Sequence, residues 1–189
     1  MRRVLLLIAT AALLAACSAE TPGRAEPAPA PEPTGLALPP RPHELPLDGV
    51  DPCALLTPDQ RASLGLDGDP VPYRSTAPGF AGPACSISGF EPRAVAVGLA
   101  LATGNGIEVL TNSDALTDEI TPITIAGFPA ILARPKNPDF CSVDVDVADG
   151  QFLDVQFADG GRLPPIPQDQ LCRDAVEVAE QVLTTLLSR

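Results

Sequence analysis

Residues 141–157 read CSVDVDVADGQFLDVQF, and apolar residues alternate with polar ones along both halves. A period of two on either side of an Asp-Gly pair predicts a β-hairpin. A two-residue turn at that pair would place Val145 opposite Asp154 and direct acids toward the core. A three-residue loop at 148–150 instead pairs Val145 with Leu153 and keeps the apolar residues on one face. We therefore predict the three-residue loop, with its glycine in the left-handed conformation.

Regular patterns on both sides of the hairpin predict the rest of an antiparallel sheet and one long helix. Residues 93–103 alternate between large and small residues, which predicts a strand whose small face another element covers closely. Residues 123–126 and 129–133 predict two more strands around Gly127. Apolar residues recur at helical spacing over 168–187, so an amphipathic helix should pack on the sheet.

Capping signals predict short helical segments at the start of the domain. Asp51-Pro52 and Thr57-Pro58 each place a capping residue before a proline, and Gly65 is a suitable helix end. Together these patterns predict an α+β fold. We expect an antiparallel sheet of four or five strands, with the N- and C-terminal helices packed on one face and two disulfides.

Four cysteines follow residue 50, and an even number in an oxidising compartment predicts two disulfides with three possible connectivities. We favour Cys53–Cys172, because both lie at helix starts, and Cys85–Cys141, because both lie in strand-like segments. The sequence alone leaves the connectivity open. Cys-x-x-Cys spacing is absent, so structural bridges are a better interpretation than redox or zinc chemistry.

The N-terminus has the organisation of a secretory signal. Arg2 and Arg3 precede the apolar run 4–14, which is about half the roughly 20 residues that a membrane-spanning helix needs. Leu14-Ala15-Ala16 before Cys17 resembles a bacterial lipobox. We therefore expect residues 1–16 to be cleaved and Cys17 to carry lipid, which would anchor the chain to the cell membrane at its extracytoplasmic face.

Proline-rich sequence separates Cys17 from the domain. Residues 18–48 contain nine prolines, and missing amide donors prevent a helix or a sheet ladder there. We expect 17–49 to be a lipidated, semi-rigid tether of polyproline II character and 50–189 to form the disulfide-linked domain.

The charge of the exported chain restricts its partners. The formal charge of −12 becomes −14 without residues 1–16, because two arginines and no acids are lost. An acidic surface repels phosphate backbones, so we expect no nucleic acid partner. Attachment to the membrane should therefore depend on the lipid.

Few residues are suited to catalysis. The only histidine, His43, lies in the predicted tether, which excludes Ser/His/Asp and Cys/His arrangements. Asp144, Asp146 and Asp149 alternate along a strand and lack the spacing of a calcium loop, so a solvated strand face is the better interpretation. Asp144 and Asp154 can still lie opposite each other and bind a cation weakly. We predict no catalytic residues, no metal and no cofactor, and we do not expect an enzyme.

Two long Pro/Gly-rich segments are candidates for a binding surface. Residues 67–84 carry Tyr73, Arg74 and Phe80, and residues 160–167 carry a Leu-Pro-Pro-Ile-Pro run. Long ordered loops often have a function, although many only connect elements. We assign Tyr73, Arg74 and Phe80 as candidate ligand-binding residues.

Three short motifs carry a family resemblance. Residues 51–57 (DPCALLT) with Gly65 resemble the opening of a family of actinobacterial lipoproteins, catalogued as domain of unknown function 3558. Residues 127–130 (GFPA) and 172–175 (CRDA) resemble its central and closing motifs. The resemblance implies an extracytoplasmic lipoprotein with no established catalytic residues. The layout also resembles, in architecture only, the disulfide-linked sensor domains of some actinobacterial serine/threonine kinases.

These observations favour a non-enzymatic cell-envelope lipoprotein, which we expect to be a monomer. Its domain should bind a small ligand or lipid in a cleft flanked by the two long loops. The alternative is an acidic protein-interaction module that docks a membrane or cell-wall partner, and a hydrolase has the least support. A binder should have a closed apolar pocket, whereas an interaction module should have a flat exposed patch.

Overall fold

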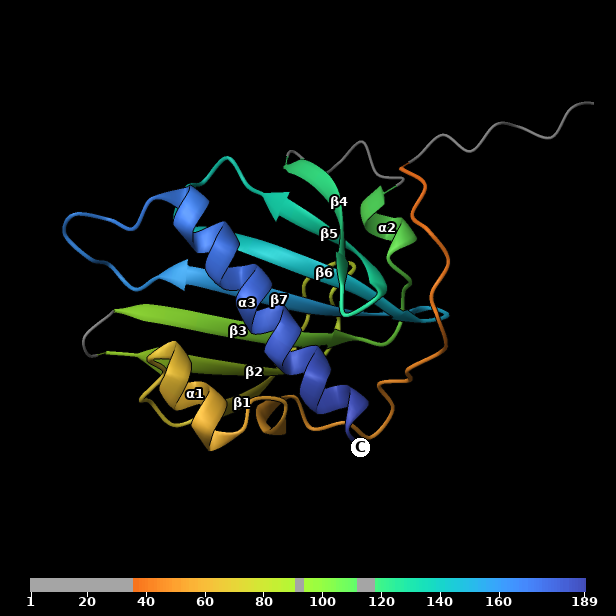
Figure 1. Cartoon of the computed structure of the whole chain (residues 1–189), viewed down its shortest axis with the longest axis horizontal. Helices are drawn as coiled ribbons and strands as arrows, with labels where there is room; N and C mark the ends of the chain where they lie inside the picture. Colours follow the sequence, from red (N-terminus) through yellow and green to blue (C-terminus); the bar gives the residue numbers. More distant parts are fainter. Residues whose placement is uncertain (1–35, 91–93, 112–117) are drawn as a thin grey trace, which may run out of the picture. The chain divides into compact units, whose positions relative to one another are not determined.

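The computed structural model describes residues 36–90, 94–111 and 118–189. Its centre is an antiparallel sheet of seven strands in the order β1-β2-β3-β7-β6-β5-β4 (Figure 1). The strands are β1 (Val71–Ser75), β2 (Gly82–Gly89), β3 (Val95–Ala102), β4 (Glu119–Ile125), β5 (Phe128–Arg134), β6 (Phe140–Ala148) and β7 (Gln151–Asp159). The helices are the 3-10 turn η1 (Pro52–Ala54), α1 (Pro58–Leu64), α2 (Glu108–Thr111) and α3 (Gln168–Leu187).

The α+β class is confirmed, but the prediction of four or five strands is wrong. The two additional strands, β1 and β2, lie in or beside the Pro/Gly-rich segment that we interpreted as a loop. Pro72 is tolerated in β1 because this strand is at the edge of the sheet. The outer side of an edge strand pairs with no other strand, so a missing amide donor there costs no hydrogen bond of the sheet.

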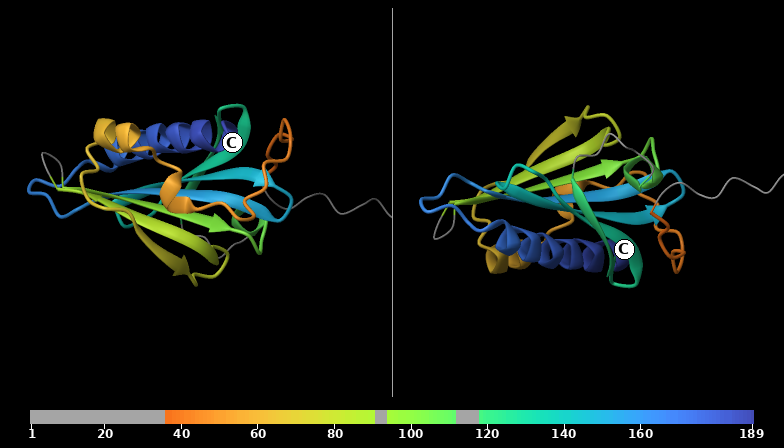
Figure 2. Two further views of the ribbon diagram at one scale, coloured as in Figure 1. Left: turned by 90° about the horizontal axis from the view of Figure 1, so that it is seen from below. Right: turned by 90° about the horizontal axis from the view of Figure 1, so that it is seen from above.

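The N- and C-terminal helices cover the same face of the sheet, as predicted (Figure 2). The long helix α3 lies over β6 and β7, and its apolar residues pack into the main core with Val143, Val145 and Val155. In α1, Thr57 and Gln60 form a reciprocal capping box, and Gly65 ends the helix at a φ of 73°.

The β6–β7 hairpin has the predicted register, with Val145 opposite Leu153. Its loop is shorter than predicted, because Ala148 pairs with Gln151 and leaves only 149–150 in the turn. A register shift between Asp146 and Ala148 supplies the extra residue, so that the apolar residues keep their face. The predicted left-handed glycine is present, with a φ of 66° at Gly150.

Both predicted disulfide pairings, Cys53–Cys172 and Cys85–Cys141, are wrong. The bridges are Cys53–Cys85 and Cys141–Cys172, with Cα–Cα distances of 5.2 and 4.9 Å. Each bridge joins a helical segment to a strand beneath it, η1 to β2 and α3 to β6. The prediction paired cysteines from similar elements, helix with helix and strand with strand. In the structure the helical segments lie on the sheet, so each disulfide links a helical segment to the strand that it covers.

The described part of the expected tether lies against the domain. Over residues 36–49, the Leu45 amide donates to a backbone carbonyl of β6 at 2.8 Å, and Leu47 is only 1 % exposed. The ring of His43 packs edge-on against Phe128, with 5.1 Å between centroids. The two leucines between the prolines provide apolar surface that this segment buries against the sheet.

The face opposite α3 has a smaller apolar cluster at one end. Phe152, Ile131 and Ala102 meet Ile107 and Leu110 from the segment around α2. We predicted that another element closely covers the small face of β3. Ala100 is buried, but Ala96 and Gly98 are only half-buried, so the cover is partial.

Candidate functional site

Two open grooves lie beside the first turns of α3. The loop groove has a volume of about 360 Å³ and is lined by Arg162, Pro164, Pro165, Ile166, Pro167 and Gln170. The strand groove has a volume of about 330 Å³ and is lined by Leu132, Arg134, Asp169, Cys172, Arg173 and Val176. The first includes most of the Leu-Pro-Pro-Ile-Pro run, and the second runs between α3 and β5.

Asp159, at the end of β7, organises the loop groove. Its Oδ1 accepts hydrogen bonds from the amides of Gly161 at 2.7 Å and Arg162 at 2.8 Å, and its Oδ2 accepts one from Ile166. Desolvation alone would raise the pKa of Asp159, but these amide donors outweigh it and lower the pKa. One ionised carboxylate therefore folds the Pro-rich segment back onto the start of α3.

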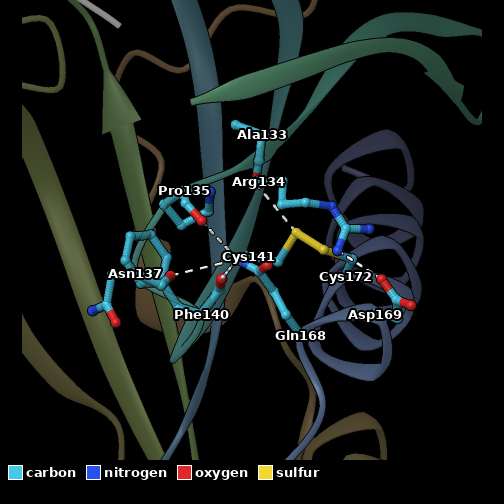
Figure 3. Close-up of a disulfide and its surroundings, with 9 residues drawn as sticks. All are labelled: Ala133, Arg134, Pro135, Asn137, Phe140, Cys141, Gln168, Asp169 and Cys172. Carbon is cyan, nitrogen blue, oxygen red and sulfur yellow. Dashed lines mark hydrogen bonds and ion pairs between the residues drawn. A yellow bond between two sulfur atoms is a disulfide. The ribbon is translucent and has the colours of Figure 1, made fainter. Parts of the chain in front are cut away.

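The strand groove exists because α3 covers β6 and β7 and leaves the surface of β5 beside it. The Cys141–Cys172 bridge fixes the helix to β6, and the Gln168 side chain donates to the Pro135 carbonyl at 2.8 Å (Figure 3). Leu132 and Val176 are partly buried against the main core and provide the apolar floor.

Arginines provide most of the charge in both grooves. Arg134 pairs with Asp169 at 2.6 Å, and Arg173 donates to Gln170 Oε1 at 2.6 Å, so that a side chain of the strand groove contacts one of the loop groove. The two linings together contain three arginines and one acid, whereas the whole chain has a formal charge of −12. The grooves are therefore much less negative than the average surface and suit an anionic group.

One protein family has a sequence model that matches residues 12–185, and its description is "Protein of unknown function (DUF3558)". The chain belongs to the DUF3558 family. No curated protein and no solved structure gave a match. Of the three motifs that carried the resemblance, the closing one, 172–175, contributes Cys172 and Arg173 to the strand groove of this DUF3558 protein.

The residues that the sequence suggested for ligand binding line neither groove. Tyr73 is half-exposed on the edge strand β1, and burial, followed by the charge of Asp154, raises its pKa. Arg74 follows on β1 and is exposed. Phe80 packs edge-on against Phe152, with 5.4 Å between centroids, and belongs to the smaller apolar cluster.

The sequence indicated the Pro-rich loop 160–167 but missed the strand groove. Arg134 and Arg173 lie far apart along the chain, and no spacing rule links them. They meet only because α3 lies diagonally beside β5 (Figure 1). The Cys141–Cys172 pairing would have been the one available signal, since it fixes the start of α3 next to the β5–β6 hairpin.

The acidic hairpin face differs from its prediction. Asp144 and Asp154 lie opposite each other, but both are buried rather than solvated. Within the residues that the structure describes, no group of three or more His, Cys, Asp or Glu side chains could hold a metal ion. None of the described helices is long and apolar enough to cross a membrane.

Proposed function

We propose that this DUF3558 protein is a non-enzymatic lipoprotein of the cell envelope, anchored through lipid on Cys17. Its domain binds a small amphipathic anion, such as a lipid with an acidic head group, in the grooves beside the start of α3. The observation that carries this proposal is an apolar floor edged by arginines on a strongly acidic protein.

The dimensions and chemistry of the grooves support a small ligand. Their volumes of about 360 and 330 Å³ fall at the lower end of the range of about 300–1,000 Å³ for ligand sites. Leu132 and Val176 offer contact to an acyl or ring portion, and the Arg173 guanidinium can donate two parallel hydrogen bonds to a carboxylate or phosphate. Neither groove is enclosed, unlike the closed pocket that we expected of a binder, so the ligand keeps part of its surface in water.

The non-enzymatic assignment rests on the chemistry of the side chains. The single histidine packs against Phe128, away from both grooves, so no histidine base is near the arginines. Arginine binds anions but does not exchange protons near neutral pH, because its pKa is above about 12.

The test compares two arginines on the same protein. The chain from residue 18 onward, secreted with its disulfides formed, is titrated with oleate and with an acidic phospholipid below micelle formation, and bound ligand is counted by native mass spectrometry. We expect Arg173→Gln to weaken binding about tenfold, as expected for the loss of one charge-assisted hydrogen-bonding group. Arg74→Gln removes the same charge from β1 and should leave binding unchanged.

Two results contradict the proposal. Equal loss in both variants would indicate only a general charge effect, and loss in Arg74→Gln alone would return the site to β1. A long-chain amine should not bind in place of oleate, because the groove arginines repel it.

A second candidate is a protein-interaction module, which the open form of both grooves favours. Leu163, in the loop beside them, is 96 % exposed and would be the apolar contact of such a module. Photo-crosslinking from position 162 in envelope membranes distinguishes the two functions. A single protein adduct that is lost in Leu163→Asp, with unchanged oleate binding, would favour the interaction module.

A further inference from the structure

Two carboxyl groups face each other in the middle of the sheet, on the face opposite α3. Asp144 of β6 stands directly across from Asp154 of β7, and these residues are 2 % and 3 % exposed. Their neighbours in the same cross-strand row are Ala100 on β3 and Ile131 on β5, both buried. Ionising both carboxyl groups in such surroundings would be very unfavourable without a compensating charge.

The hydrogen bonds of the pair leave one oxygen unsatisfied on each side. Asp154 Oδ2 accepts from the Gln156 side chain at 3.1 Å, but among the residues that the structure describes Asp144 Oδ1 and Asp154 Oδ1 have no hydrogen-bond partner. A proton on either carboxyl group would turn one oxygen of the pair from an acceptor into a donor, which two ionised carboxylates lack. The Arg41 guanidinium does not fill this role, because it binds Asp146 at 2.6 Å and Glu44 at 2.8 Å.

We propose that Asp144 and Asp154 form a proton-binding pair that keeps at least one proton near neutral pH, so that the folded domain loses stability as the pH rises. Burial is the largest cause that raises the pKa of Asp144 well above its usual range, and the charge of Asp154 adds to it. Burial also raises the pKa of Asp154 to about 7, against the opposing hydrogen bonds from Asp144 and Gln156. The two carboxyl groups titrate as a pair.

Of the residues that the structure describes, the charged and titratable groups around the pair do not oppose this effect. Asp118, ahead of β4, raises the pKa of Asp144 further, and Tyr73 on β1 is itself affected by the charge of Asp154. Asp146 on β6 is paired with Arg41, and burial raises its pKa, with a smaller contribution from Glu108 of α2. Apart from Arg41, these neighbours are acids or a tyrosine, so they add no positive charge.

The sign of the pH dependence follows from proton counting. In the unfolded chain both aspartates ionise near pH 4, whereas the folded pair still holds a proton at higher pH. Stability from the pair is therefore fully present below about pH 4 and is lost progressively as the pH rises toward 7. Each retained proton increases the unfolding constant about tenfold per pH unit in this window.

The test is urea unfolding of the exported chain from residue 18 at pH 5, 6, 7 and 8. The ratio of the wild-type unfolding constant to that of Asp144→Asn/Asp154→Asn should rise at least about tenfold per pH unit from pH 5 to 7. Asp139→Asn/Asp149→Asn makes the same change in net charge at exposed positions and should keep the wild-type slope. If the double variant at the pair does not fold, carbon-13 NMR of the wild-type carboxyl groups must detect a pair that titrates near neutral pH.

Three outcomes overturn the proposal. The first is that both carboxyl groups titrate near pH 4, and the second is that the wild type and the double variant have the same slope. The third is that millimolar calcium or potassium at pH 8 stabilises the wild type but not the double variant. That result would mean that a cation, and not a proton, occupies the pair.

Discussion

Removing the Cys141–Cys172 bridge tests both the connectivity and its effect on stability. The bridge joins residues 31 positions apart, and the loop-entropy relation then gives about 3.7 kcal/mol at 25 °C. The double variant Cys141→Ala/Cys172→Ala should lose roughly this amount in urea unfolding. That loss is large beside the 5–15 kcal/mol that typical domains have in total.

Counting thiols in the same variant distinguishes the connectivities. With Cys53–Cys85 as the second bridge, alkylation under denaturing, non-reducing conditions should find no free thiol. If Cys53 were bonded to Cys172 and Cys85 to Cys141, the same variant would release two thiols. The reciprocal variant Cys53→Ala/Cys85→Ala, which opens a loop of nearly equal separation, should lose a similar free energy. Two free thiols, or a loss below about 1 kcal/mol, would refute the reasoning.

Three further changes test local parts of the fold. Gly82→Ala places a Cβ 1.9 Å from a backbone carbonyl oxygen of β3, so it should lower the melting temperature markedly, whereas Gly104→Ala, with no atom within 4 Å, should not. Asp159 has a lowered pKa, so its hydrogen bonds stabilise the loop groove above about pH 4, and this stabilisation is lost as the pH falls through its folded pKa. The protection of the Ile166 amide from exchange, relative to the intrinsic rate at each pH, should fall there, and in Asp159→Ala it should be low at all pH values. Thr57→Ala removes half of a capping box and should cost about 1 kcal/mol in urea unfolding.

Local patterns correctly predicted the strands and the helix in which apolar residues recur at a single regular spacing. The pairing of Val145 with Leu153 followed from parity alone, because a shift by one residue would have turned every apolar residue of a strand outward. The strand pair around Gly127 was also predicted, and Ala126 and Gly127 both have positive φ there, as a tight hairpin turn requires. The helix α3 was predicted over its full length.

The sequence did not predict the features that depend on contacts between segments far apart along the chain. The segment around Pro72 has turn composition, yet it forms an edge strand because β2 provides a partner. Asp144 and Asp154 have the alternation of a solvated face, yet both are buried on the face opposite α3, which alternation alone does not indicate. The strand groove requires the placement of α3 beside β5, which no local pattern encodes.

The two disulfides should therefore differ in their effect on function, although they close loops of similar length. Cys172 lines the strand groove and its partner lies on β6, so this bridge holds one wall of the groove in place, whereas Cys53–Cys85 joins η1 to β2. If the grooves bind the anion, opening Cys141–Cys172 should weaken oleate binding, and opening Cys53–Cys85 should not. Both variants are compared at a temperature where each is more than 95 % folded by circular dichroism. Equal binding in the two variants would mean that ligand binding does not depend on the Cys141–Cys172 bridge. Other contacts would then have to hold the first turns of α3 in place.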